Sequence, residues 1–314
     1  MPVEEPNPHG LLVVDKPPGP TSYDVIRFLR HTCGLDRKHK IGHLGTLDPF
    51  ASGVVVVALG QAVKYSEYAI ALSKTYRARL WLGEETDTLD PTGKTINSAP
   101  VPADWKERLS EAATKFIGEI KQIPPDFSAK QIDGKRAYKE ARLGTSLKLE
   151  PVNVKIYQLD FGDSGDSWID FTCAVSGGTY VRAIARDLAR EIGTVGHLVG
   201  LERLAVGPYN SDISIPFEAF ELGGNHVLMH HLKPVNGILE HLPALKLKHD
   251  TCVDEKIIHG KDLIPEDFSH ASSLLESLDD AATLVIMDPD GKFRAMGRYR
   301  ASNGGIIPFK PWTV

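Results

Sequence analysis

The order of apolar and polar positions along the chain predicts strands of two kinds. Residues 11–14 and 54–59 are short, uninterrupted apolar runs, which predict strands buried in a core. Residues 75–83 and 167–175 instead alternate between apolar and polar side chains, as strands with one buried face do. The pattern thus separates fully buried strands from half-buried ones.

Helical spacing of apolar residues predicts helices between these strands. The first begins after residue 20, where Thr21 or Ser22 can cap it and Asp24 stands three residues after Thr21, as in a capping box. Residues 104–116 and 179–192 predict two more helices. Because strands and helices alternate without a regular βαβ rhythm, the fold class is expected to be α+β.

The chain divides into a large and a small part. Residues 282–300 predict a hairpin with a Pro/Gly-containing turn, so a small β-rich domain is expected over residues 241–314, after a larger domain of residues 1–240. Within the large domain, residues 122–150 combine turn residues with a basic half-helix. This segment is expected to be an excursion over the surface that orders on a ligand.

Charge is distributed unevenly along the 314 residues, whose formal net charge is −5. Residues 27–43 carry five Arg or Lys against one Asp, and residues 127–148 carry six against two acids. Two basic regions on an acidic chain can bind a polyanion while the remaining surface repels it. From charge alone, solvated surface faces are an equally good interpretation.

Several classes of protein are disfavoured by composition. No stretch approaches the roughly 20 apolar residues that span a bilayer, and the first ten residues lack the pattern of a signal peptide, so a cytoplasmic protein with no membrane partner is expected. The three cysteines, Cys33, Cys173 and Cys252, are too far apart for a CxxC metal site and are expected to be free thiols.

A single carboxylate, Asp48, lies in a glycine-rich loop directly before the apolar run at 54–59. Glycines at 42, 45 and 53 free the backbone, whereas Pro49 restricts Asp48 to extended conformations. The arrangement suits a carboxylate held rigidly at the floor of a cleft. An Asp-Pro pair that only forms a turn fits the same pattern.

Other interpretations of the chemistry-bearing residues are weaker or stay open. His39 and His43 have the spacing of metal ligands on a helix, but the glycines between and after them disfavour a helix and no third ligand follows. The segment 176–188, with Arg182 and Arg186 four residues apart, can be an ordinary helix with a salt bridge. Alternatively, Arg182 points into a cleft and pairs with a carboxylate.

Together, these segments resemble the TruB-type tRNA pseudouridine synthases, which isomerise uridine 55 in the T-loop of tRNA. The resemblance rests on the order and spacing of "GLLVVDKPPGPTSYDV", "KIGHLGTLDPFASG", "KTYRARLWLG", "SGGTYVRAIARDL" and "LERLAVGPY". It implies a pseudouridine synthase fold, with a mixed, largely antiparallel central sheet flanked by helices, and a PUA-like RNA-binding domain at the C-terminus. It also implies chemistry that requires no metal or organic cofactor.

The resemblance implies specific residue roles. Asp48 matches the catalytic aspartate, Tyr76 the tyrosine that stacks on the target base, and Arg182 the arginine that pairs with the acid. The positions implied in substrate binding are His43, Leu201, Lys16, Pro17, Gly42, Thr46, Tyr180 and Lys64. One departure is Gln131, which stands where the family usually has a lysine and puts individual RNA contacts of the excursion in doubt.

The implied partner is the T-arm of tRNA, bound by a monomer without an obligate protein partner. Two mechanisms fit the residues equally: attack by Asp48 on C6 of the base, or loss of the C2′ proton to give a glycal. Two rival functions share the scaffold, namely a guide-RNA-dependent pseudouridine synthase and a non-catalytic RNA-binding or RNA-folding protein.

Overall fold

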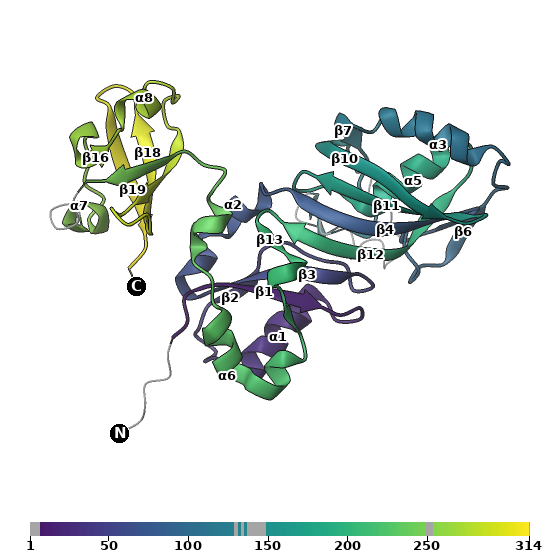
Figure 1. Cartoon of the computed structure of the whole chain (residues 1–314), viewed down its shortest axis with the longest axis horizontal. Helices are drawn as coiled ribbons and strands as arrows, with labels where there is room; N and C mark the ends of the chain where they lie inside the picture. Colours follow the sequence, from purple (N-terminus) through teal and green to yellow (C-terminus); the bar gives the residue numbers. More distant parts are fainter. Residues whose placement is uncertain (1–6, 129–130, 133–134, 137–148, 249–253, 314) are drawn as a thin grey trace.

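The computed structural model describes residues 7–128, 131–132, 135–136, 149–248 and 254–313. Its centre is a ten-stranded mixed sheet in the order β14-β1-β3-β12-β4-β11-β10-β7, with β2 paired to β3 and β13 paired to β12 (Figure 1). All pairs are antiparallel except β1–β14 and β3–β12. The expected α+β class with a largely antiparallel sheet is confirmed. The strands are β1 (Gly10–Lys16), β2 (Ile41–His43), β3 (Ser52–Leu59), β4 (Lys74–Leu82), β7 (Gly118–Gln122), β10 (Val152–Ser164), β11 (Trp168–Val175), β12 (Gly196–Val206), β13 (Tyr209–Asn210) and β14 (Ile215–Pro216).

Burial explains the two strand patterns of the sequence. On β3, Val55 and Val57 face the core that contains the helices, whereas Val54 and Val56 face a second core on the opposite side. An uninterrupted apolar run therefore marks a strand covered on both faces. Strand β4 alternates strictly between buried and exposed positions because its outer face is open to solvent.

The helices α1 (Ser22–Thr32), α3 (Trp105–Thr114), α5 (Val181–Glu191) and α6 (Ala219–His231) cover one face of the sheet. The short helix α2 (Ser66–Ile70) lies on the other face, where its Ala69 belongs to the second core. Helix α5 packs on β12 and β4, α3 packs on α5, and α6 packs on α1 (Figure 1). The capping box expected before the first helix is present, since Thr21 and Asp24 each accept a hydrogen bond from the other's backbone N–H. No helix in the described ranges is long and apolar enough to cross a membrane.

A separate five-stranded sheet follows in the order β16-β15-β17-β18-β19. The predicted hairpin is β17–β18, and in its turn Asp288 accepts hydrogen bonds from the backbone of Asp290 and Lys292 while Gly291 takes φ 85°. This part consists of β15 (Ala244–Leu247), α7 (Asp254–Ile258), β16 (Phe268–Ser269), α8 (Ser272–Leu275), β17 (Thr283–Met287), β18 (Phe293–Arg300) and β19 (Gly305–Pro311).

The C-terminal sheet shares a core with the central one. The Tyr65 hydroxyl, at the end of the 3-10 helix η1 (Gly60–Tyr65), donates to the Lys310 carbonyl at 2.7 Å. The Tyr65 ring also lies edge-on to Phe293, with centroids 4.9 Å apart, and Trp312 packs beside both. The two sheets are therefore joined by buried aromatic contacts.

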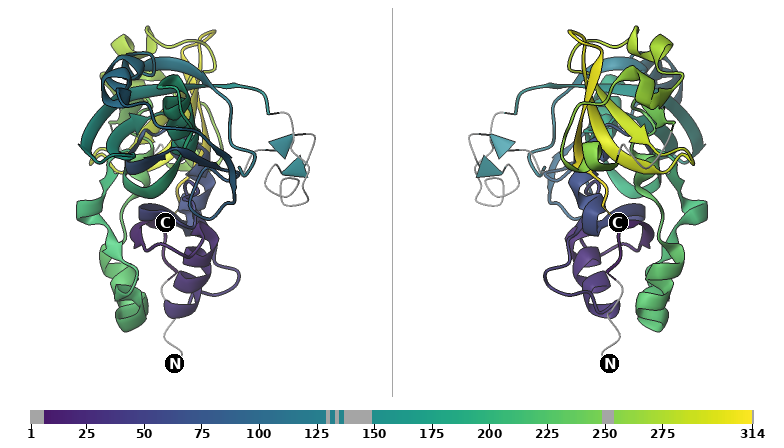
Figure 2. Two further views of the ribbon diagram at one scale, coloured as in Figure 1. Left: turned by 90° about the vertical axis from the view of Figure 1, so that its right-hand side faces the viewer. Right: turned by 90° about the vertical axis from the view of Figure 1, so that its left-hand side faces the viewer.

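The basic excursion contains a short strand pair, β8 (Gln131–Ile132) with β9 (Lys135–Arg136). Figure 2 shows this pair standing away from the body of the molecule. The basic half-helix expected after the turn residues of this segment falls mainly on residues 137–148, which lie outside the described residues. The other basic positions of the excursion, from Lys130 to Lys148, lie outside the described residues, as does Cys252. Cys33 and Cys173 are buried free thiols, as expected.

Strand β3 approaches β12 closely at Gly53, which has φ +103°. A Cβ there would lie 2.3 Å from the Arg203 carbonyl oxygen, whereas Gly19, at φ +113°, has no atom within 4 Å of its Cβ position. We predict that Gly19→Ala lowers the free energy of unfolding by about 1–3 kcal/mol through backbone strain. Gly53→Ala should cost at least about 1 kcal/mol more, because overlap adds to strain.

Urea denaturation of both variants measures the two effects. Equal losses would mean that the β3–β12 approach is not the constraint on Gly53.

Candidate active site

The loop between β2 and β3 is held by a buried lysine from β1. Lys16 is fully buried, and its ammonium donates to the backbone carbonyls of Pro17 at 2.9 Å, Pro49 at 3.3 Å and Ala51 at 2.6 Å. Burial, with a further contribution from Arg203, lowers the pKa of Lys16 to about 8, so the group is still mostly charged at neutral pH. Lys16 therefore fixes the backbone that follows Asp48 in the chain.

Arg203 on β12 fixes the part of the same loop that precedes Asp48. Its guanidinium is almost fully buried and donates to the carbonyls of Val54 at 2.7 Å, Thr46 at 3.0 Å and Gly45 at 3.2 Å. A buried guanidinium needs such acceptors for its N–H groups. Arg203 thus joins the start of β3 to the loop in front of it.

The residue before the acid is pinned from α1. The backbone N–H of Leu47 donates to Ser22 Oγ at 2.8 Å, and the Ser22 hydroxyl lies 3.2 Å from the Leu47 carbonyl. One residue later, the Asp48 carbonyl accepts from the Ala51 N–H at 3.1 Å. With this backbone constrained on three sides, the carboxylate of Asp48 has a defined direction.

Asp48 forms a two-pronged ion pair with Arg182, in the first turn of α5. Nε of Arg182 lies 2.8 Å from Oδ2 of Asp48, and Nη2 lies 3.1 Å from Oδ1. The other N–H groups of Arg182 donate to the carbonyls of Thr88 at 2.7 Å and Phe127 at 3.1 Å, and Nη1 lies 3.4 Å from Asp90. Two N–H groups of the planar guanidinium thus face one carboxylate, and its remaining N–H groups hold it in that orientation.

The electrostatics of Asp48 reflect two opposing effects. Burial raises the pKa of the carboxyl above its ordinary value of 3.8, and the Arg182 guanidinium acts against this shift. The side chain of Arg182 is only 6% exposed, whereas that of Asp48 keeps 30%. The acid is therefore desolvated on the protein side and open on the other.

That open side is a cavity of about 390 Å³. Six of the residues implied by the resemblance line it: Thr46, Asp48, Tyr76, Tyr180, Arg182 and Leu201. Others that line it are Ile70, Lys74, Phe127, Ser128 and Arg203. A volume of this order lies in the range of small-ligand pockets.

Tyr76 reaches the cavity from the middle strand of the sheet. On β4 it pairs with Arg203 of β12 on one side and Cys173 of β11 on the other. Burial raises the pKa of its hydroxyl, which therefore stays protonated, and only 8% of the residue is exposed. The ring is thus a fixed wall of the cavity beside Asp48.

The remaining predicted residues lie outside this cavity. Lys16 and Pro17 lie at the end of β1, where the Lys16 ammonium holds the loop between β2 and β3. Gly42 and His43 are the last two residues of β2, directly before that loop. Lys64 lies on η1 and lines a different cavity. The metal interpretation of the histidines finds no support, since no group of three or more possible ligands occurs among the residues with described positions.

Three residues of the site were not singled out by sequence reasoning: Arg203, Lys74 and Asp90. Lys74 is buried, donates to three carbonyls at the end of α2, and has its pKa lowered to about 8 by burial. Lys74 and Arg203 lie inside segments quoted for the resemblance, but they donate to backbone carbonyls, which leave no signal in the sequence. The Asp90 carboxylate instead accepts from the Thr88 and Thr92 hydroxyls and lies beside Arg182.

Comparison with known proteins agrees with this geometry. Residues 31–181 match the family described as "TruB family pseudouridylate synthase (N terminal domain)". The protein named tRNA pseudouridine synthase B of Caldanaerobacter subterraneus is 37% identical over 279 residues, covering 88% of this chain and 93% of the relative. The chain belongs to the TruB family of pseudouridylate synthases. The Aquifex aeolicus protein of the same name is 31% identical and covers 95% of this chain and 97% of the relative.

Solved structures support the fold of this TruB-family chain. A chain in an H/ACA RNP bound to a substrate RNA containing 2′-deoxyuridine aligns with TM-score 0.71 and 21% identity, covering 98% of this chain and 86% of that one. A chain in a Cbf5-Nop10-Gar1 complex aligns with TM-score 0.70 and 24% identity, covering 98% and 84%. The expected pseudouridine synthase fold and the isomerase class are confirmed.

The position of Arg203 generates a prediction for the pH dependence of pseudouridine formation. Because burial places the pKa of Asp48 above 3.8, the rate should fall as the pH drops through a value above 3.8. Arg203 lowers this pKa, so Arg203→Met should move the acid limb to higher pH. It should also reduce kcat by about tenfold or more, because the loop loses three hydrogen bonds.

Arg79→Met is the matched control, since Arg79 lies on the outer face of the sheet and pairs with Asp170. A lower kcat with an unshifted pH profile would contradict the electrostatic part of this role.

Proposed function

We propose that this TruB-family chain converts uridine 55 in the T-loop of tRNA to pseudouridine. The observation that carries the proposal is the Asp48 carboxylate, held by both prongs of Arg182 at the edge of a cavity that Tyr76 and Leu201 also line. The names of the relatives from Caldanaerobacter subterraneus and Aquifex aeolicus support tRNA as the substrate.

The reaction breaks the N1–C1′ bond, turns the uracil, and joins C1′ to C5, after which the C5 proton leaves. The product is an isomer of the substrate, so no oxidant and no water are consumed. Both open routes begin with ionised Asp48, which either attacks C6 or takes the C2′ proton. Arg182 keeps the acid charged and directs it.

Uridine must leave its loop to reach Asp48. Extruding a base costs a few kcal/mol, and stacking on an aromatic ring returns about 1–3 kcal/mol. Tyr76 offers such a ring, and Leu201 packs near it in the cavity. His43 ends β2 and directly precedes Leu44, which lines the cavity, and it is uncharged at neutral pH because burial lowers its pKa. It is proposed to occupy the place that the base vacates.

The remaining surface supports binding of the T-arm. Lys38, Lys40 and Lys64 gather around one cavity near β2, where they can contact phosphates. We take residues 1–240 as the catalytic domain, with the excursion 122–150 contacting RNA, and 241–314 as a PUA-like RNA-binding domain. The enzyme is proposed to act as a monomer in the cytoplasm.

The decisive experiment maps pseudouridine in unmodified tRNA after incubation with the purified protein. Wild type should modify position 55, both in full tRNA and in a T-arm hairpin without any guide RNA. Asp48→Ala should bind the hairpin with similar affinity but form no pseudouridine. Asp160→Ala, an exposed acid on β10, is the control and should keep full activity.

Modification only with an added guide RNA would support the guide-dependent rival. Wild-type turnover by Asp48→Ala would remove Asp48 from the mechanism.

Arg182→Ala should reduce kcat by about 10²–10³-fold with little change in KM, because it removes an interaction directed at the reacting centre. Arg186→Ala is the matched control on the same helix, since Arg186 is equally buried but pairs with Asp187. Single-turnover kinetics with the T-arm hairpin separate rate from affinity. A defect confined to affinity would contradict the assigned role.

A further inference from the structure

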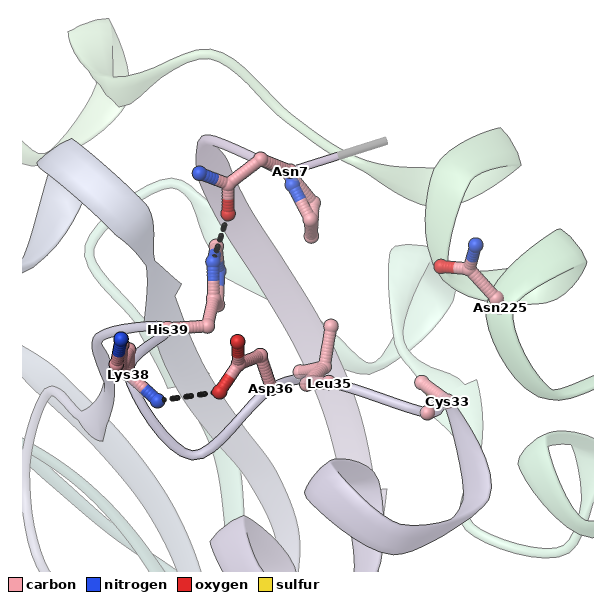
Figure 3. A pocket seen from close by; sticks show the side chains of 9 residues that line it. Asn7, Cys33, Leu35, Asp36, Lys38, His39 and Asn225 are labelled. Atoms are coloured by element: carbon pink, nitrogen blue, oxygen red, sulfur yellow. Dashed lines mark hydrogen bonds between the residues drawn. The ribbon is translucent and has the colours of Figure 1, made fainter. Parts of the chain in front are cut away.

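A second cavity, of about 330 Å³, lies outside the active site (Figure 3). Its walls come from the end of α1 and the loop after it, from the segment before β1, and from α6. The lining residues used below are Asn7, Asp36, Lys38, His39 and Asn225. None of them contributes to the Asp48 cavity.

The walls of this cavity are preformed. Arg30 on α1 donates to the carbonyl of His39 at 3.0 Å and also to that of Asp36, which holds the loop across its width. On the other side, α6 is kinked at Gly224, with φ 46°. A Cβ at Gly224 would lie 2.7 Å from the Thr32 carbonyl, so only glycine brings this part of α6 so close to α1.

Two buried polar atoms on these walls have no hydrogen-bond partner within the described structure: Nε2 of His39 and Oδ1 of Asn225. His39 is 93% buried, with 7% exposed. Its Nδ1 bonds to Oδ1 of Asn7, an acceptor, so Nδ1 carries the proton. Burial lowers the pKa of the ring, which is therefore neutral, and its Nε2 is left as an acceptor. The Pro8 carbonyl accepts a hydrogen bond from the ring, which opposes the lowering of the pKa, and Nε2 itself has no hydrogen-bond partner among the described residues.

The cavity walls therefore contain two acceptor atoms, Nε2 of His39 and Oδ1 of Asn225, that a ligand with N–H or O–H groups could satisfy. Figure 3 shows Asn225 opposite Asn7 and His39, with its amide oxygen turned towards the cavity. The carboxylate of Asp36 adds a further acceptor on the rim, although one of its oxygens already accepts from the Lys38 N–H at 2.9 Å. Unpaired buried acceptors cost free energy unless a ligand supplies N–H or O–H groups.

A neighbouring cavity of about 200 Å³ shares Asn7, Lys38 and His39 with the first. It adds Lys40 and Lys64, so cationic groups lie next to the acceptor-rich space. Strand β2 leads from Lys40 to the active-site loop, and the seven residue-to-residue steps from His39 to Thr46 span at most about 25 Å. A single RNA can therefore contact both places.

The geometry points to a binding site for an unpaired nucleotide of the substrate RNA, with an amino-bearing base in the His39–Asn225 cavity and its phosphate at the lysines. The inference rests on the proposed function only in taking RNA as the ligand. Guanine fits best, because its Watson–Crick edge carries adjacent N–H and NH2 donors. Uracil fits worse, since it offers one N–H between two carbonyl acceptors.

The test uses guanosine 5′-monophosphate and uridine 5′-monophosphate as probes. With the full-length protein, the guanosine nucleotide should bind at one site and shift the Nε2 signal of His39 in long-range ¹H–¹⁵N spectra, assigned with His39→Gln. Asn225→Ala should weaken this binding by about two- to tenfold, the value of one hydrogen bond. His226→Ala, the exposed neighbour on α6, should leave it unchanged. Thermal unfolding checks that both variants are folded.

The guanosine nucleotide should also raise the KM for T-arm RNA without lowering kcat, and this inhibition should be lost in Asn225→Ala. Stronger binding of the uridine nucleotide, an unmoved Nε2 signal, or equal effects of the two variants would overturn the proposal. Binding seen only after deletion of residues 1–6 would identify the chain's own N-terminus as the occupant and would also overturn it. Pseudouridine formation by wild type is measured separately, so the proposed function stands or falls independently.

Discussion

The ion pair between Asp48 and Arg182 is the constraint on which the site depends. A carboxylate removed from water favours its protonated form, and here burial does raise the pKa of Asp48. Folded protein then binds this proton more tightly than unfolded chain, so stability declines as the pH rises from the unfolded pKa through the folded one. Keeping the acid ionised at neutral pH therefore works against folding. The bidentate contact with Arg182 offsets part of that cost.

The loop around the ion pair is held by hydrogen bonds from buried cationic side chains to backbone carbonyls. Lys16 and Arg203 spend their N–H groups on backbone carbonyls on either side of Asp48, and Ser22 holds the residue between them. Buried cations are costly unless each donor has a partner. Here the partners are loop carbonyls that a core of side chains alone could not satisfy. The same cations make the cavity attractive to an anionic substrate.

Much of this could be predicted from the sequence, because it depends on patterns that the sequence contains. The uninterrupted run in β3 and the alternation in β4 reflect how many faces of each strand are covered. A carboxylate between glycines and a proline indicated the rigid loop. The role of Arg203 was not predictable, since "LERL" does not reveal which carbonyls surround the guanidinium. The separation of Lys64 from the Asp48 cavity likewise depends on where η1 turns after β3.

The aromatic contacts among Tyr65, Phe293 and Trp312 join the two sheets in one hydrophobic core. Tyr65 ends η1, the 3-10 helix that follows β3, and its partners belong to the C-terminal part of the chain. A substitution that unfolds the C-terminal sheet would thus also expose apolar residues of the central sheet. Loss of the C-terminal sheet would therefore also destabilise the half of the chain that carries the Asp48 cavity.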